Sequence, residues 1–279
     1  MDQLRPPQFA RFQKLVYAHS GIRLDQRKLT LLTSRVRKRL RATGMEDVDV
    51  YYDYVTSRGG RTELASLLDA VTTNETSFFR TQEHFTWFQE TFLPERIADK
   101  ANANSPARLR LWSAACSNGA EPYTLAFTLY EMRHRFTGWD TSILATDLSE
   151  VSLKQARSGE YRGRIMEGLS DEQRSRFFKP VAGGDETFRV KDSHRSLITF
   201  AGHNLMEPLQ SPLQPFDCVF LRNVLIYFDY ESKQTVIRNV VNAMASGGYL
   251  VVGPSEGVYG MHQPLLKRST FLYQKEAAS

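Results

Sequence analysis

Two carboxylate side chains follow apolar segments at positions where α/β proteins commonly hold ligands. Residues 111–125 (LWSAACSNGAEPYTL) are typical of a strand, a turn of small residues and a helix with Pro122 at its first position, where a missing N–H costs nothing. Such a turn lets backbone amides approach a ligand closely. Glu121 favours a cationic or hydroxyl-bearing ligand, because it would repel a phosphate. The segment also lacks the GxGxxG and GxxxxGK[ST] patterns.

Asp147 closes the next apolar segment, ILATDLS at residues 143–149. A carboxylate at the end of a strand in a doubly wound sheet can hold ribose hydroxyls. Each carboxylate alone also fits a structural role, Glu121 as a capping group and Asp147 as the N-cap of the next helix. Together, after successive strands, they favour a nucleoside ligand without phosphates, and S-adenosylmethionine is such a ligand.

Other chemistries find less support. Cys116 has no histidine partner motif among the 6 histidines and is interpreted as a buried structural thiol. His84 and His203 show no ligand spacing, so no metal is expected. Tyr227 lies in an apolar run, and it fits both a half-buried tyrosine at a strand end and a site residue.

The elements that must position these residues fall into two groups. The first hundred residues predict helices at 8–19, 26–42 after Asp25 as N-cap, 50–57, 61–71 and 82–100 after Thr81 as N-cap. Residues 101–107 (ANANSPA) are the best candidate for a linker. Residues 1–100 are therefore predicted to form a helical N-terminal domain.

Residues 101–279 predict strands that alternate with helices. Strands are expected at 109–115, 143–147, 216–221 and 249–253, and helices from 122, at 150–157 and at 232–245. This alternation predicts an α/β fold with a doubly wound, mostly parallel sheet. Residues 160–200 interrupt it with glycines and short strand-like pieces at 188–190 and 197–200, which predict a small inserted β subdomain.

One predicted helix is strongly basic. Residues 26–42 contain 7 Lys and Arg and no acidic residue, whereas Leu29, Leu32, Val36 and Leu40 form one apolar stripe. Residues 1–60 hold 12 Lys and Arg against 6 Asp and Glu, so the chain's net charge of +5 belongs to this part. The simplest interpretation of such a run is a solvated face, but its size favours an acidic partner. Nucleic acid is one candidate.

The composition is that of an ordinary globular protein, with 41% hydrophobic and 24% charged residues. No run of about 18 apolar residues predicts a membrane span, and the N-terminus has no secretory signal. Cys116 and Cys218 match no disulfide or zinc pattern. We therefore expect a cytoplasmic protein without membrane insertion.

Six segments in succession resemble the signature blocks of the CheR family of chemotaxis receptor methyltransferases. They are TTNETSFFR (72–80), LWSAACSNGAEPYTLA (111–126), LATDLS (144–149), HNL (203–205), FDCVFLRNVLIYFD (216–229) and GGYLVVGPSE (247–256). Several long blocks in the family's order are far more specific than one short motif. The resemblance implies a Rossmann-like S-adenosylmethionine-dependent methyltransferase with a helical N-terminal domain and a small antiparallel β insertion.

The resemblance also implies roles for individual residues. The cofactor S-adenosylmethionine, and its product S-adenosylhomocysteine, would be bound by Asn74, Thr76, Arg80, Glu121, Asp147, Asn204, Leu205, Arg222 and Asn223. Arg80, Arg222 and Tyr227 would lie near the methyl group and the substrate. Arg35, Lys38 and Arg39 of the basic helix would contact the cytoplasmic helical bundle of a methyl-accepting chemotaxis receptor.

The activity that this implies is O-methylation of receptor glutamate side chains to glutamyl methyl esters. Two alternatives stay open at this point: a nucleic-acid methyltransferase, and a non-catalytic module that binds a receptor or regulator. The strand that ends in Arg222-Asn223-Val224-Leu225 lacks the Asn/Asp-Pro-Pro-aromatic turn of amino-directed nucleic-acid enzymes, so nucleic acid is not expected as partner.

Overall fold

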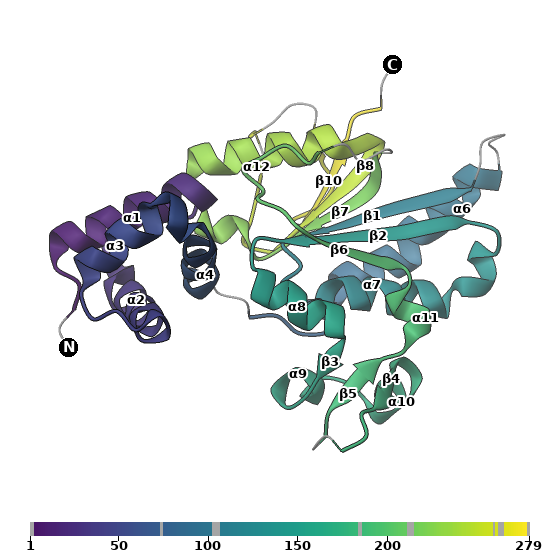
Figure 1. Ribbon diagram of the computed structural model, residues 1–279. Helices are drawn as coiled ribbons and strands as arrows, with labels where there is room; N and C mark the ends of the chain where they lie inside the picture. Colours follow the sequence, from purple (N-terminus) through teal and green to yellow (C-terminus); the bar gives the residue numbers. More distant parts are fainter. Residues whose placement is uncertain are drawn as a thin grey trace.

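The structure is a computed structural model that describes residues 3–72, 75–101, 107–183, 186–210, 215–258, 260–261 and 265–277. A bundle of helices lies beside a larger part built on a sheet (Figure 1). The fold class predicted from the sequence is confirmed. Among the described residues, no helix combines the length and the apolar character that crossing a membrane requires.

The N-terminal bundle contains four helices and two short 3-10 turns. Its elements are α1 (Pro6–Ser20), η1 (Gln26–Lys28), α2 (Leu29–Thr43), α3 (Val48–Thr56), η2 (Arg58–Gly60) and α4 (Arg61–Val71). Phe12, Leu32, Val36, Tyr51 and Leu67 meet in its core, each at most 1% exposed. The basic helix is confirmed, but Asp25 makes no capping hydrogen bond and pairs with Arg27 instead. A 3-10 turn therefore precedes the helix.

The helix predicted at 82–100 is present but packs elsewhere than expected. It consists of α5 (Gln82–Trp87), a π-helical turn η3 (Phe88–Phe92) and α6 (Leu93–Ala101). Its aromatic residues Phe85, Phe88 and Phe92 are buried in one core with the sheet residues Leu111 and Phe220. By its contacts this helix belongs with the sheet and not with the N-terminal bundle. The predicted cap Thr81 has a φ of 61° and makes no capping bond.

The central sheet has seven strands in the order β6-β2-β1-β7-β8-β10-β9. They are β1 (Arg108–Ala114), β2 (Asp140–Asp147), β6 (Ile198–Gly202), β7 (Phe216–Leu221), β8 (Met244–Val252), β9 (Leu265–Lys267) and β10 (Leu272–Lys275). The first five strands of that order are parallel to one another. β10 is antiparallel to β8, and β9 is antiparallel to β10.

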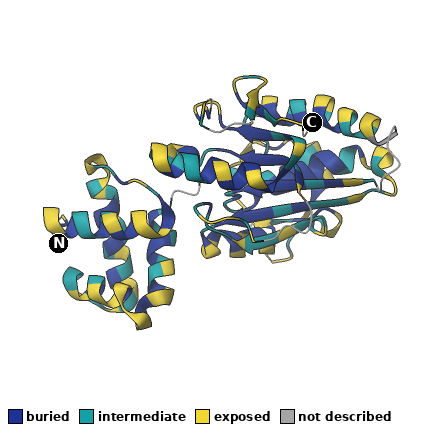
Figure 2. Ribbon diagram, turned by 90° about the horizontal axis from the view of Figure 1, so that it is seen from above, coloured by how far each residue is buried: buried dark blue, intermediate teal, exposed yellow. Residues whose placement is uncertain are grey.

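Helices cover both faces of this sheet, as Figure 1 shows for α12 on one face and α7 on the other. They are α7 (Ala120–Glu131), α8 (Glu150–Ser158) and α12 (Tyr230–Ala243), and two 3-10 turns, η4 (Arg133–Phe136) and η5 (Leu225–Tyr227), follow α7 and β7. Alternate strand residues face the two layers, so that Val219 packs with Val236 and Val240 of α12. Figure 2 shows the resulting buried centre. Because Gly119 forms a left-handed cap, α7 begins two residues before Pro122.

The β subdomain is smaller than the sequence indicated. It comprises β3 (Glu160–Tyr161), α9 (Arg164–Glu167), α10 (Asp171–Phe177), β4 (Phe178–Pro180), β5 (Phe188–Val190) and α11 (Asp192–Arg195), with the strands in the order β3-β5-β4. The strands are antiparallel, as expected. The piece predicted at 197–200 is not part of it, because it forms β6 and pairs in parallel with β2.

The strand register determines where loops meet. Asp147 at the end of β2 is level with Gly202 of β6, and Ala114 of β1 is level with Leu221 of β7. The loops after these four strands therefore meet at one edge of the sheet. The N-terminal bundle lies next to this edge (Figure 1).

Candidate active site

A cavity lies at this edge, between the N-terminal bundle and the carboxyl ends of the parallel strands. Its walls include Ile22, Arg23, Lys28 and Leu31 from the bundle, Glu75, Thr76 and Arg80 from the connecting segment, and Ser117, Glu121, Asp147, His203, Asn204, Leu205, Arg222, Asn223 and Tyr227 from the sheet loops. Of the nine predicted cofactor residues, eight line it. The ninth, Asn74, lies outside the described residues.

The turn after β1 places backbone amides at the cavity wall. Ala115, Ser117 and Gly119 have positive φ angles of 66°, 51° and 90°. Left-handed residues thus alternate with Cys116 and Asn118, which do not have positive φ, and the backbone is tightly coiled. The Ser117 N–H donates to Asp147 Oδ2 at 2.7 Å. The sequence indicated a small-residue turn, and this geometry explains why small side chains occupy it.

Asp147 is only 8% exposed and faces the same cavity. Its Oδ1 accepts from the Ser149 N–H at 2.8 Å. Burial raises the pKa of Asp147, and the two backbone hydrogen bonds partly offset that rise. The alternative that Asp147 caps the following helix is wrong, because Ser149 is the N-cap of α8 and its Oγ accepts from Ser152 N at 3.0 Å.

Glu121 and Arg222 form a nearly buried ion pair beside this turn. Arg222 Nη1 donates to Glu121 Oε2 at 3.0 Å, and the two side chains are 2% and 11% exposed. Ser113 Oγ donates to Glu121 Oε1 at 2.7 Å, and Arg222 Nη2 donates to the backbone carbonyl of Arg80. The pair therefore connects β1, β7 and the segment that carries Arg80.

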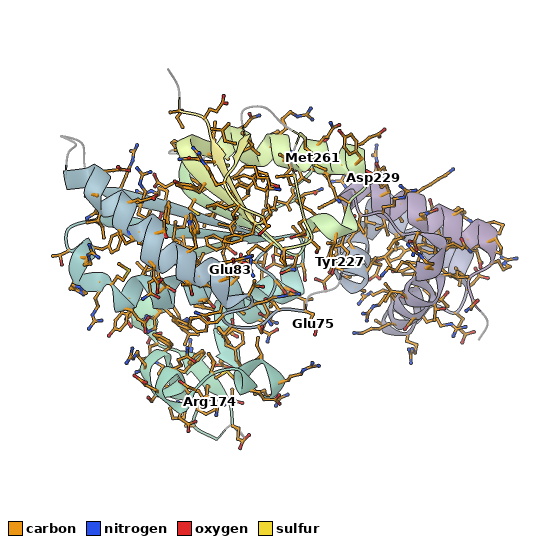
Figure 3. The ribbon with its side chains drawn as sticks, turned by 180° about the vertical axis from the view of Figure 1, so that it is seen from behind. Glu75, Glu83, Arg174, Tyr227, Asp229 and Met261 are labelled. Carbon is orange, nitrogen blue, oxygen red and sulfur yellow. The ribbon has the colours of Figure 1, made fainter. Side chains whose placement is uncertain are left out.

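Arg80 and Tyr227 are half-buried residues of the cavity wall. Arg80 is half-buried, and its Nη1 donates to the Glu75 carbonyl at 2.7 Å. Tyr227 belongs to η5, is half-buried, and its hydroxyl has no hydrogen bond to any other described residue. Figure 3 shows Tyr227 and Glu75 at the junction between the N-terminal helices and the sheet. Tyr227 is therefore not a strand-end residue.

Asn204 and Leu205 occupy the loop after β6. Asn204 Nδ2 donates to the His19 carbonyl at 2.8 Å, which ties this loop to the end of α1. Leu205 is 7% exposed and supplies an apolar part of the cavity wall. Its carbonyl accepts from Asn239 Nδ2 of α12 at 3.0 Å. The loop is therefore held both by the N-terminal bundle and by a helix that covers the sheet.

The three predicted partner-binding residues differ in their surroundings. Lys38 is exposed and Arg35 is half-buried. Arg39 donates to both oxygens of Glu63, at 2.9 and 2.7 Å, and Tyr51 also donates to this carboxylate at 2.7 Å. Arg39 thus closes an ion pair inside the bundle. Its contact with a partner stays a prediction that this pairing disfavours.

Several residues at or behind the cavity wall are absent from the site residues predicted from the sequence. Arg23 and Lys28 reach it from the bundle, and Glu75 from the connecting segment. Glu256 lies behind the Asn223 loop and is 2% exposed. It is the last residue of the GGYLVVGPSE block, but nothing in the sequence indicated what it contacts.

The described residues give little support for a reactive thiol or a metal site. Cys116 is 1% exposed, and burial raises the pKa of its thiol well above the usual range, as expected of a structural cysteine. No group of three or more His, Cys, Asp or Glu side chains in that part of the chain is arranged to hold a metal ion.

The residues present fit S-adenosylmethionine. Its ribose hydroxyls suit the buried carboxylate of Asp147, whose negative charge also suits a cationic ligand, whereas the charge of Glu121 is already paired with Arg222. Leu205 offers an apolar surface to the base. The coiled turn at Ser117 brings the backbone close, and its sequence lacks the GxxxxGK[ST] pattern of a phosphate-binding loop.

Comparisons with known proteins agree with this geometry. Residues 74–271 match the family description "CheR methyltransferase, SAM binding domain", and residues 7–72 match "CheR methyltransferase, all-alpha domain". A "Chemotaxis protein methyltransferase 1" of Pseudomonas aeruginosa is 38% identical over 255 residues, which cover 90% of each protein. A "Probable chemotaxis protein methyltransferase" of Rhizobium etli is 36% identical over 248 residues, 88% of this chain and 91% of that protein. The chain therefore belongs to the CheR family of S-adenosylmethionine-dependent methyltransferases.

Proposed function

We propose that this protein methylates glutamate side chains of methyl-accepting chemotaxis receptors in the cytoplasm and forms glutamyl methyl esters. The supporting observation is that charge is unevenly distributed in one cavity. On the sheet side Arg222 is paired with Glu121, which leaves the carboxylate of Asp147, whereas Arg23, Lys28 and Arg80 outnumber Glu75 on the side of the N-terminal helices and the connecting segment. A cationic cofactor and an anionic acceptor side chain can thus be bound next to each other.

The acceptor needs no general base. A glutamate carboxylate has a pKa of about 4.3 and is already ionised at neutral pH. When bound, S-adenosylmethionine supplies a methyl group on a positively charged sulfur. The protein's task is to remove water from the carboxylate and to hold one of its oxygens in line, at about 3–3.5 Å from its target.

We assign this positioning to Arg80 and Tyr227. The half-buried guanidinium of Arg80 can donate paired N–H groups to a carboxylate, and the Tyr227 hydroxyl is free of other hydrogen bonds among the described residues. Arg222 is committed to Glu121 and to the Arg80 backbone. We therefore assign Arg222 an indirect role, in which it fixes the wall against which the cofactor and Arg80 are placed.

The receptor surface is assigned to one side of α2. At about 100° per residue, Arg35 and Lys38 fall near the side of Lys28 and Leu31, and these last two line the cavity. A continuous basic strip therefore leads from the outer part of α2 to the cavity. An acidic helical bundle fits this strip. Family membership does not favour the nucleic-acid alternative or a non-catalytic module.

The product separates these functions experimentally. The protein is incubated with methyl-labelled S-adenosylmethionine and membranes that carry a cognate receptor. We expect label on the receptor, loss of label when its acceptor glutamates are replaced by alanine, and release of the label as methanol by mild alkali, because an ester is base-labile. Alkali-stable label or label on nucleic acid would contradict the proposal.

A further inference from the structure

A buried carboxylate from a separate strand end holds the loop that carries Arg222, Asn223 and Tyr227. Glu256 follows β8 and is 2% exposed. Its Oε2 accepts from the Asn223 N–H and, at 2.9 Å, from the Gly253 N–H. Its Oε1 accepts from the Ile226 N–H at 3.3 Å. One side chain therefore contacts the loop at both ends of the turn.

The loop needs such a hold because its backbone is strained. Asn223 has a φ of 58°, a left-handed conformation that asparagine adopts more easily than most residues with a side chain, but still at a cost. Arg222, immediately before this kink, reaches Glu121. Tyr227, four residues after it, lines the cavity near the bundle. The direction of the chain at Asn223 therefore decides whether both side chains reach the same cavity.

Gly253 makes room for this contact. A Cβ added to Gly253 would lie 2.3 Å from Glu256 Oε2, closer than real Cβ contacts. The absence of a side chain at this position thus lets the carboxylate approach the backbone at both Gly253 and Asn223. Two positions, Gly253 and Glu256, cooperate in one contact.

The chemistry of the donors requires a carboxylate. In the described part of the chain no Lys or Arg pairs with Glu256. Backbone N–H groups alone approach it, so the group must be an acceptor at both oxygens. A glutamine of the same shape would place an NH₂ donor against at least one N–H, and a buried donor without an acceptor is costly.

We propose that Glu256 is a positioning residue for methyl transfer, which holds the loop of residues 222–227 in the arrangement that the cofactor and acceptor require. This inference rests on the proposed function of Arg222 and Tyr227. Glu256 itself acts through the loop backbone and does not line the cavity.

The test compares Glu256→Gln and Gly253→Ala, which disturb the same contact from its two sides. Glu63→Gln is the control, because Glu63 is also a buried carboxylate, 8% exposed, but lies in the N-terminal bundle. Calorimetry gives the affinity for S-adenosylhomocysteine, and saturating receptor and cofactor give kcat per folded molecule. The amide resonance of Asn223 in ¹⁵N NMR reports the hydrogen bond directly.

We expect both loop variants to bind S-adenosylhomocysteine about tenfold more weakly or worse, the loss that corresponds to one hydrogen bond to a charged group. Their kcat should fall even at saturation, and the Asn223 amide proton should move upfield. Glu63→Gln should lower the melting temperature without changing the affinity or the Asn223 resonance. A purely structural role for Glu256 would change the melting temperature and the Asn223 resonance but neither the affinity nor kcat.

If Glu256→Gln fails to fold, Gly253→Ala carries the test, because it leaves the charge in place. The inference would be overturned if affinity and kcat per folded molecule both stayed at wild-type values, whether or not the Asn223 resonance shifted. A wild-type protein that binds S-adenosylhomocysteine but labels no receptor would refute the proposed function. The affinity and NMR comparisons would still test Glu256 in that case.

Discussion

Strained backbone is concentrated around the cavity. Six described residues other than glycine have a positive φ. Five of them lie at or next to the cavity: Phe79, Thr81, Ala115, Ser117 and Asn223. Such conformations persist only where the surroundings impose them. Individual residues of the site are therefore held by hydrogen bonds from other elements, among them Asp147 for Ser117 and Glu256 for Asn223.

At the residue scale, Asp147→Ala should weaken binding of both S-adenosylmethionine and S-adenosylhomocysteine by about 10- to 100-fold, the loss of one or more hydrogen bonds to a charged group. Both ligands should suffer equally, since a contact with the ribose does not distinguish them. Calorimetry measures this effect. Asp217→Ala is the control, because Asp217 is a half-buried carboxylate at the start of β7 and does not line the cavity. Equal losses in the two variants would contradict the assignment.

The same residue predicts a dependence of cofactor affinity on pH. Burial raises the pKa of Asp147, so it takes up a proton at a higher pH than an ordinary aspartate. Protonation removes an acceptor, and affinity should therefore fall as the pH falls through this raised pKa. Wild type should lose affinity on acidification, whereas Asp147→Ala should show a flatter profile. Parallel profiles would show that another group is responsible.

Tyr227→Phe tests the transfer step. The substitution keeps the ring and removes only the hydroxyl, so packing at this half-buried position should survive. We expect kcat to fall at least about tenfold while cofactor affinity stays within about twofold, because one hydrogen bond to a charged group is lost. Turnover under saturating conditions, measured by label transfer, decides this. Unchanged turnover would return Tyr227 to a structural role.

At the element scale, α2 has two uses for its cations. Arg39 supports the bundle through Glu63, with the two side chains 21% and 9% exposed. Lys28, just before α2, lines the cavity. At about 100° per residue Arg35 and Lys38 fall on the same side of the helix as Lys28, whereas the exposed Arg41 falls on a different side. One basic helix thus stabilises its own domain and offers a charged surface.

Arg35→Glu with Lys38→Glu should reduce receptor methylation at least tenfold and leave cofactor affinity unchanged. Higher salt should weaken the wild-type reaction in the same direction, because exposed charges are screened over about 8–10 Å near physiological ionic strength. Arg41→Glu is the control on the same helix and should have a much smaller effect. Equal effects of the two reversals would indicate nonspecific attraction and not a defined surface.

At the scale of the whole molecule, the N-terminal bundle is joined directly to the site loops. The Arg23 N–H donates to the Tyr227 carbonyl at 2.9 Å, and Ile22 and Phe228 form an isolated antiparallel bridge. Asn204 holds the end of α1. The position of the bundle and the position of Tyr227 are therefore coupled.

Gly21 tests this junction. A Cβ there would lie 2.5 Å from the sulfur of Met206, whereas one at Gly44 would meet nothing within 4 Å. Both glycines have a φ of 70°, so Gly21→Ala and Gly44→Ala share a backbone cost of about 1–2 kcal/mol. We expect Gly21→Ala to lower the melting temperature further and to reduce methylation. Similar melting temperatures and activities for the two variants would show that the junction tolerates displacement.

Local patterns in the sequence determined the elements and the class of ligand. Apolar periodicity gave the helices of the bundle, and alternation of strands and helices gave the doubly wound sheet. Asp147 and Glu121 could be selected because the carboxyl ends of parallel strands meet at one edge whatever the details of packing. The successive CheR-like blocks then named the family, since they depend on residue order alone.

Contacts between distant segments were decided only by the tertiary structure. The helix at 82–100 packs on the sheet because its aromatic residues match that core, and periodicity cannot tell one apolar partner from another. The segment at 197–200 became β6 because β2 offered a free edge. Arg39 and Glu63 are 24 residues apart, and Asn223 and Glu256 are 33 apart. No local pattern encodes which carboxylate a buried donor will meet, because that depends on how the whole chain closes around it.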